Sequence, residues 1–285
     1  MPGLSQAEKA QKFLSLHRGP RILVLPNAWD LSSARIFEDA GFPAIATTSS
    51  GIANSLGFPD GQHISREQML EVVERIANAV SIPVTADMEG GYGTTIDAMA
   101  ETARGVIAAG AVGLNLEDSP EETSGKLFDI PLQKEKIAAI VEVGKKMGVP
   151  LVVNARTDVY LEKIGAPSER FAHAVERLNA FREAGAASLF APVVEDAETI
   201  AALARAVRGP LNVLARAGTP PVRELEKLGV ARVTVGGGPM RATMGLVSRI
   251  AGELRDQGTY NLMLENLMPS DRANSLMLKR RGKSN

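Results

Sequence analysis

Short apolar segments rich in β-branched residues recur along the chain and alternate with longer segments of helical period. Eight short segments are distinguished: RILVLP (21–26), AIATTS (44–49), PVTADME (83–89), VGLNLE (112–117), PLVVNAR (150–156), SLFAP (188–192), LNVLAR (211–216) and ARVTV (231–235). Runs of this length between Gly and Pro residues predict buried parallel strands rather than helices.

The intervening segments predict amphipathic helices. The clearest cover residues 66–79, 96–109, 133–146 and 168–184. In the first of these, Met69, Val73 and Ile76 share one face, and Ser65 with Gln68 forms a capping box. Glycines stand where left-handed caps are expected after helices: Gly41, Gly110, Gly148, Gly185 and Gly229.

Eight strand-then-helix units within about 235 residues predict an α/β fold of the (β/α)₈ TIM-barrel type. The alternative is an open doubly wound sheet, but its GxGxxG phosphate fingerprint does not follow the first strand. We expect the barrel to occupy residues 1–258 and a C-terminal helical tail to occupy residues 259–285. The apolar segment Leu262–Met268 in that tail is expected to dock either on a partner subunit or on its own barrel.

Composition narrows the classes of function. The chain has no cysteine, which excludes disulfides, thiolate metal sites, Fe–S clusters and a cysteine nucleophile. With 32 basic and 33 acidic residues, it is not expected to bind nucleic acid or an anionic membrane as its main partner. No apolar run is long enough to span a membrane and the N-terminus does not resemble a signal peptide, so we expect a cytoplasmic protein.

Four carboxylates are expected to converge at the carboxyl ends of the strands, where such barrels place their active sites: Asp60, Asp87, Glu89 and Glu117. Asp87 and Glu89 alternate along one predicted strand, so both face the barrel mouth. Converging carboxylates repel one another unless a cation lies among them, and all-oxygen ligands favour Mg²⁺, with Mn²⁺ as a substitute. The competing interpretation is that these acids are helix caps and turn residues.

Arg156 follows the fifth predicted strand, and its guanidinium fork suits a bidentate carboxylate or phosphonate. Its alternative role is an ion pair with one of the acids. The predicted substrate contacts are Trp29, Ser49, Ser50, Gly51, Asp87, Arg156 and Arg216. The Ser-Ser-Gly segment offers hydroxyl and backbone N–H donors to a second anion, or else it is simply a polar turn.

Four motifs in this order resemble those of the isocitrate lyase/phosphoenolpyruvate mutase superfamily: SLGFPDG (55–61), ADMEGGYG (86–93), LNLEDS (114–119) and NARTD (154–158). The resemblance covers roughly residues 20–258 and implies a (β/α)₈ barrel, Mg²⁺ and a 2-oxo acid or its enolate as ligand. It implies that Asp87 ligates the metal directly while Asp60, Glu89 and Glu117 hold its water shell. It further implies that the Ser-Ser-Gly segment and Arg156 hold the substrate carboxylate, and that tetramers form with the last barrel helix exchanged between subunits.

The loop after the fourth predicted strand departs from the superfamily's signatures. Lyases carry a Lys-Lys-Cys-Gly-His loop whose Cys protonates the departing enolate, and mutases carry Lys-x-Asn-Ser. This chain reads DSPEETSGK at 118–126, so Glu121 and Glu122 become candidates for the missing acid. Arg216 stands where the lyases have an Asn-containing run that binds extra carboxylates, which argues against large tricarboxylate substrates.

We therefore expect a Mg²⁺-dependent enzyme that cleaves a C–C bond of, or decarboxylates, a small 2-oxo or 2-hydroxy acid through an enolate. Its catalytic candidates are Asp60, Arg156, Glu121 and Glu122. The alternatives are C–P bond chemistry, as a phosphonopyruvate mutase or hydrolase, and a barrel that binds a 2-oxo acid without turnover. A homo-oligomer, dimer or tetramer, is expected in each case.

Overall fold

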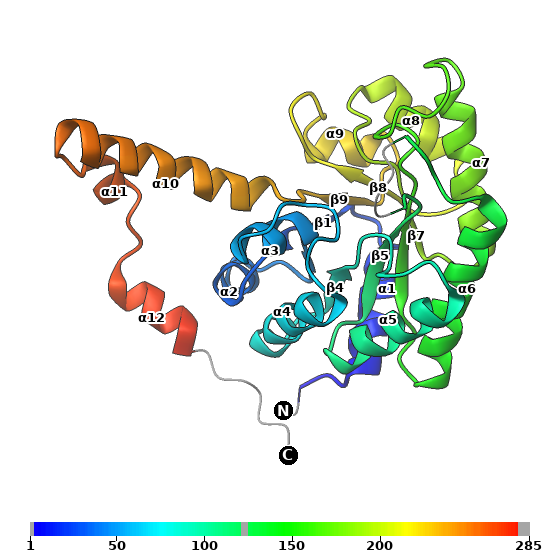
Figure 1. Ribbon diagram of the computed structural model, residues 1–285, viewed down its shortest axis with the longest axis horizontal. Helices are drawn as coiled ribbons and strands as arrows, with labels where there is room; N and C mark the ends of the chain where they lie inside the picture. Colours follow the sequence, from blue (N-terminus) through cyan, green and yellow to red (C-terminus); the bar gives the residue numbers. More distant parts are fainter. Residues whose placement is uncertain (1–2, 121–124, 279–285) are drawn as a thin grey trace.

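Parallel strands form a closed barrel in the computed structural model, which describes residues 3–120 and 125–278 (Figure 1). The strands pair in the order β1-β9-β8-β7-β6-β5-β4-β3-β2. Their bounds are β1 Leu23–Leu25, β2 Asn27–Ala28, β3 Ile45–Thr47, β4 Val84–Asp87, β5 Gly113–Glu117, β6 Val152–Arg156, β7 Ser188–Phe190, β8 Leu211–Leu214 and β9 Arg232–Thr234. Each lies within one of the eight predicted strands except for the C-terminal half of the first, so the predicted (β/α)₈ barrel is confirmed.

The first predicted strand is divided at Pro26, and the barrel closes there. On one side of it β1 pairs with β9, and on the other β2 pairs with β3. Pro26 has no N–H to donate, but its carbonyl oxygen accepts a bond from the Ala46 amide at 2.9 Å. The Leu23 amide donates to the Ala231 carbonyl oxygen at 2.8 Å, which joins the first strand to the last.

The helices surround this barrel. They are α1 Gln6–Leu16, α2 Leu31–Asp39, α3 Ser49–Ser55, α4 Arg66–Ala79, α5 Ile96–Ala108, α6 Ile130–Lys146, α7 Arg170–Glu183, α8 Ala197–Ala206, α9 Val222–Lys227, α10 Gly238–Gln257, α11 Asn261–Glu265 and α12 Ser270–Leu278. Among the described residues, no helix is both long and apolar enough to cross a membrane.

The local signals in the sequence fix most helix ends. Helix α4 has its predicted bounds, and both halves of the Ser65–Gln68 capping box form. Helix α6 begins three residues before its predicted start, because Asp129 caps it by accepting a hydrogen bond from the Leu132 amide at 2.8 Å. The predicted cap glycines all adopt positive φ angles: Gly41, Gly110, Gly148, Gly185 and Gly229.

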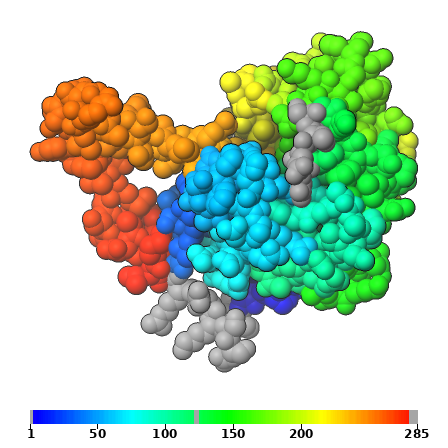
Figure 2. Space-filling view, in the orientation of Figure 1, coloured from blue at the N-terminus to red at the C-terminus, as the bar shows by residue number. Residues whose placement is uncertain are grey.

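The last helices leave the barrel and form a C-terminal arm, α10 to α12, that returns to it only at its end (Figures 1 and 2). Of the 20 residues of α10, only Met240 and Glu253 are buried. The arm makes contact again where α12 packs on α2 of the same chain, with Arg35 Nη1 donating to the Leu276 carbonyl oxygen at 2.8 Å. The second half of the predicted tail therefore docks on its own barrel. Its exchange between subunits and the division at residue 258 remain predictions.

Candidate active site

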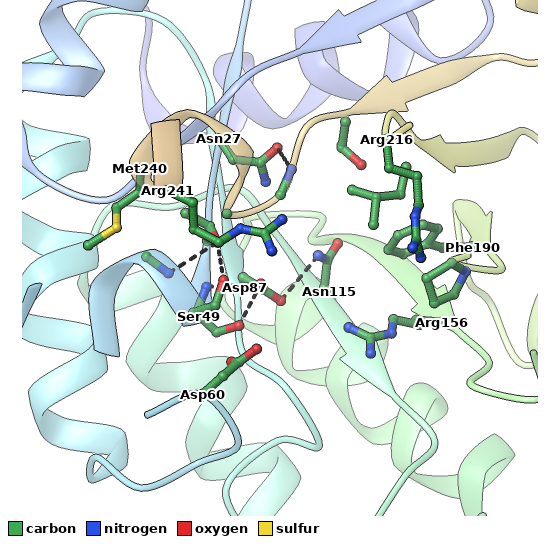
Figure 3. A pocket seen from close by; sticks show the side chains of 18 of the residues that line it. Asn27, Ser49, Asp60, Asp87, Asn115, Arg156, Phe190, Arg216, Met240 and Arg241 are labelled. Atoms are coloured by element: carbon green, nitrogen blue, oxygen red, sulfur yellow. Dashed lines mark hydrogen bonds between the residues drawn. The ribbon is translucent and has the colours of Figure 1, made fainter. Parts of the chain in front are cut away.

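A cavity of about 460 Å³ opens at the carboxyl ends of the strands (Figure 3). Many residues predicted for the site line it: Ser49, Ser50, Gly51, Asp60, Asp87, Arg156 and Arg216. Its size falls within the range of small-molecule pockets, about 300–1,000 Å³. The barrel therefore brings together residues from positions 49 to 216 of the chain.

Asp87 lies at the centre of this cavity at the end of β4 and is 9% exposed (Figure 3). Its Oδ2 accepts hydrogen bonds from the Ser49 amide at 3.0 Å and the Ser49 hydroxyl at 2.9 Å. Its Oδ1 accepts one from Asn115 Nδ2 at 3.2 Å. Asn115 is oriented in turn by Asn154 Nδ2, which donates to Asn115 Oδ1 at 2.8 Å. The carboxylate is thus held in one orientation by residues from three neighbouring elements.

Glu89 lies beyond the end of β4, in a left-handed conformation with φ 48°, rather than on the same strand as Asp87 as predicted. Its Oε1 accepts from the Gln62 amide and its Oε2 from the Tyr92 hydroxyl, both at 2.9 Å. Burial and the nearby Asp87 carboxylate raise the pKa of Glu89 to about 7. Partial burial and the same carboxylate raise the pKa of Asp60. The acids around Asp87 therefore repel one another.

Arg156 is held by two acids at the end of β6. Its Nε and Nη2 donate to the two carboxylate oxygens of Asp158, at 2.5 and 3.2 Å, and its Nη1 pairs with Glu117. Burial raises the pKa of Glu117, and the Arg156 guanidinium opposes that rise. These contacts engage three of the five N–H donors of the guanidinium, so two remain for a ligand. The predicted ion pair and a role in ligand binding are thus compatible.

The same acids connect the cavity to the loop after β5. Ser119 Oγ donates to Asp158 Oδ2 at 2.5 Å, and the Asp158 amide donates to Asp118 Oδ1 at 2.9 Å. Asp118 also accepts a bond from Arg177 Nε at 2.7 Å, and Arg177 Nη2 donates to the Phe128 carbonyl oxygen at 2.6 Å. Both ends of the loop are therefore attached to the network around Arg156. The predicted acids Glu121 and Glu122 lie outside the described residues.

The Ser49–Gly51 segment forms the first turn of α3 rather than a simple polar turn. Gly51 packs too closely for any side chain, because an added Cβ would lie 2.6 Å from Thr48 Cγ2 and 2.9 Å from Trp29 Cβ. Trp29 is packed against the hydrophobic core and lies behind Gly51, whereas Gly51 itself lines the cavity. Its contact with Gly51 shows a supporting position for Trp29.

An apolar wall lines the opposite half of the cavity, formed by Leu161, Phe190, Pro192, Val193 and Leu214. It comes from the segments that follow β6, β7 and β8. Val193 has φ 59°, which is a strained conformation for a β-branched residue and costs about 1–3 kcal/mol. Arg216, at the rim of this half, pairs through Nε with Glu195 Oε1 at 2.7 Å.

Comparison with known proteins identifies the family. The family model described as phosphoenolpyruvate phosphomutase matches residues 13–255. The chain belongs to the phosphoenolpyruvate phosphomutase family. The resemblance of its strand-end motifs to the isocitrate lyase/phosphoenolpyruvate mutase superfamily is thereby confirmed.

Relatives of this family member include enzymes with named activities. An uncharacterized protein from Mycobacterium tuberculosis is 34% identical over 244 residues, covering 86% of this chain and 89% of that protein. The 2-methylisocitrate lyase of Halalkalibacterium halodurans is 27% identical and covers 92% of this chain and 87% of its own. The oxaloacetate decarboxylase of Rhodopseudomonas palustris is 29% identical, covering 81% and 79%. A crystal structure from Burkholderia cenocepacia J2315 superposes with a TM-score of 0.90 at 37% identity, covering 97% of this chain and 98% of that one.

The carboxylates of this family member fit Mg²⁺ held largely through water, rather than a closed cage of protein ligands. Within the described parts of the chain, no three His, Asp or Glu side chains gather closely enough to hold an ion by themselves. Mg²⁺ keeps several waters and usually takes one or two carboxylates directly. Asp87, with Asp60 beside it in the cavity, offers such a set of hard oxygen donors (Figure 3). The raised pKa values of Asp60 and Glu89 indicate negative charge that a cation would neutralise.

Sequence reasoning missed Arg241, which lies in the first turns of α10 and lines the cavity (Figure 3). No other described residue forms a hydrogen bond or ion pair with its side chain at the distances that define them, although its charge lowers the pKa of Asp60. The only signal was its place three residues after the Gly236–Gly238 run. The apolar wall was also missed, because apolar residues at strand ends look like core residues in a sequence.

Proposed function

We propose that this chain is a Mg²⁺-dependent enzyme that cleaves or decarboxylates a small 2-oxo or 2-hydroxy acid through an enolate. The observation that carries the proposal is the cavity itself, which combines the acids Asp60 and Asp87 with the cations Arg156 and Arg241. The activities named for its relatives, 2-methylisocitrate lyase and oxaloacetate decarboxylase, support this substrate class.

In this proposal Asp87 holds Mg²⁺ directly, and Asp60, Glu89 and Glu117 hold its water shell. When bound, the ion acts as a Lewis acid that stabilises the negative charge of the enolate. Arg156 binds the substrate carboxylate with its two remaining N–H donors, while Asp158 fixes the plane of its guanidinium.

Further groups of this chain complete the proposed site. The Ser49–Gly51 turn supports the carboxylate end and holds Asp87 in place. Arg241, from the far side of the cavity, attracts a second charged group of the substrate. The proton for the enolate comes from Glu121, Glu122 or a water that they position, because the chain has no cysteine to supply it.

A substrate screen tests the proposal directly. Oxaloacetate, branched malates and phosphonopyruvate are incubated with the protein and Mg²⁺, and the products are identified by NMR. Cleavage or decarboxylation of a carboxylic acid that ceases in EDTA is the expected result. Turnover of phosphonopyruvate alone would instead establish C–P chemistry, which the name of the matching family model favours. Binding of these acids without any product would identify a non-catalytic barrel.

Metal binding is predicted to depend on Asp87. Asp87→Asn removes a charged ligand and is expected to weaken Mn²⁺ or Mg²⁺ binding at least tenfold, as loss of metal-site groups typically does. Isothermal titration or Mn²⁺ spin resonance measures the dissociation constant without any assay of activity. Asp97→Asn, at an exposed acid in the first turn of α5, is the matched control. Equal affinities of the wild type and Asp87→Asn would overturn the assignment.

A further inference from the structure

The cavity has two chemically different halves. Asp60, Asp87 and Ser49 lie on one side of the view in Figure 3, together with Arg241, and they supply charge and hydrogen bonds. The apolar wall of Leu161, Phe190, Pro192, Val193 and Leu214 lies on the other half. A 2-oxo acid with no further substituent contacts the polar half and leaves this wall without a partner. The wall is built for another part of the ligand.

The arginine at the rim of the apolar wall is already neutralised. Arg216 Nε lies 2.7 Å from Glu195 Oε1, and both side chains are about two-fifths exposed, at 43% and 40%. An additional carboxylate placed here would meet the charge of Glu195 as well as that of Arg216. The half of the cavity between Arg156 and Arg216 therefore favours an uncharged group.

Val193 is the residue that directs the apolar wall into the cavity. With φ 59° it adopts a conformation that is unfavourable for a β-branched side chain, and its neighbour Pro192 is rigid and buried. A residue with a strained backbone and no hydrogen-bonding side chain contributes nothing to the carboxylate chemistry. Its placement on the cavity lining is instead explained by contact with a bound apolar group.

We infer that the apolar wall is a subsite for an alkyl substituent of the substrate, and that Val193 is its specificity-determining residue. This inference rests on the proposed function, in that the polar half is taken to bind the carboxylate and 2-oxo group. The substrate class is thereby narrowed to small acids that carry a short alkyl branch. The unsubstituted acids are then weaker ligands.

Binding of two non-cleavable 2-oxo acids tests the inference. The dissociation constants of pyruvate and 3-methyl-2-oxobutyrate are measured by isothermal titration of the full chain with Mg²⁺. The wild type is expected to bind the branched acid about tenfold more tightly, which is the effect of burying two further methyl groups. Val193→Gly is expected to reduce this ratio at least threefold while leaving pyruvate binding unchanged. Equal binding of the two acids by the wild type, or binding of neither, would overturn the inference.

Two further variants separate specificity from strain. Lys163→Gly changes another residue with positive φ, 53°, that is exposed and does not line the cavity, so the ratio of the two constants should stay at the wild-type value. Leu214→Ala removes a second part of the apolar wall and should lower the ratio even if Val193→Gly does not fold. Unchanged ratios in the folded wall variants would contradict the assignment.

The outcome is distinguishable from that of the proposed function. A preference for the branched acid without cleavage of any substrate in the screen would preserve the subsite and remove the lyase activity. Cleavage of oxaloacetate with no preference for alkyl groups would overturn the subsite alone.

Discussion

Arg156 illustrates how one side chain serves two environments at the residue scale. It is ion-paired with Glu117 and held by both oxygens of Asp158, yet it lines the cavity. A strand-end Arg was predicted from the sequence because the residue type and its position suffice for that. Its partner Asp158 was not predicted, because nothing local distinguishes an acid that orients an arginine from one that caps a turn.

Replacement of Arg156 by Lys keeps the charge but removes the planar fork. We expect kcat/KM for the substrate found in the screen to fall by about 30- to 1,000-fold, which corresponds to about 2–4 kcal/mol of transition-state binding. Arg182→Lys, at an arginine whose Nη1 donates to the Ala186 carbonyl oxygen outside the cavity lining, is the control. An unchanged kcat/KM in Arg156→Lys would show that Arg156 is structural.

His17 is predicted to make stability depend on pH. It caps α1 with Nδ1 2.8 Å from the Phe13 carbonyl oxygen, and burial together with the charge of Arg232 lowers its pKa to about 3. The unfolded chain takes up this proton near pH 6.5 and the folded chain only near pH 3, so this histidine's contribution is complete above pH 6.5 and is lost as pH falls. Between pH 7.5 and 5 the loss in the free energy of unfolding is about 2 kcal/mol.

Urea unfolding at several pH values measures this effect. In His17→Asn the side-chain amide replaces the Nδ1 donor and does not titrate, so its stability should fall less between pH 7.5 and 5 than that of the wild type. His63→Gln, at an exposed histidine, should follow the wild type. Parallel curves for His17→Asn and the wild type would refute the prediction.

At the scale of elements, the loop after β5 is the segment whose role depends most on its surroundings. Its two ends are attached to the Asp118–Asp158 network, through Ser119 and through Phe128. The loop was predicted to close over the mouth because its sequence before Leu127 has no apolar residue to bury. That motion and the placement of Glu121 and Glu122 remain predictions.

The acids of this loop are tested by substitution one at a time. If either protonates the enolate, Glu121→Gln or Glu122→Gln should slow turnover and change the stereochemistry of solvent-deuterium incorporation into the product. Glu142→Gln, at a surface acid of α6, is the control. Unchanged rate and stereochemistry in both loop variants would assign protonation to water.

At the scale of the whole molecule, the alternation of strand and helix was sufficient to predict the barrel, because eight such units bury their apolar faces in only a few ways. The departure of α10 from that barrel was not predicted. Its sequence is amphipathic like that of the other helices, and periodicity alone does not say which surface an apolar face will meet. The C-terminal arm consequently exposes large apolar side chains: Met244, Val247, Leu254, Leu264 and Leu267.

We expect this arm to associate with a second copy of the chain, because contiguous exposed apolar surface is a mark of interaction sites. Deletion of residues 259–285 should shift the particle to a smaller species in light scattering. Deletion of residues 279–285 alone is the control and should leave the mass per assembly at the wild-type number of subunits. A wild-type protein that is monomeric at micromolar concentration would contradict this expectation.

The closure of the barrel at Pro26 has a consequence for how the chain acquires its activity. Asn27 Oδ1 accepts hydrogen bonds from the amides of Val235 and Gly236, both at 2.9 Å, and Asn27, Gly236 and Arg241 all line the cavity. During synthesis the first strand must therefore wait for more than 200 further residues before the pocket exists. Ligand affinity is thus gained at the last step of folding, and a nascent or truncated chain that lacks β9 would be unable to recognise its substrate.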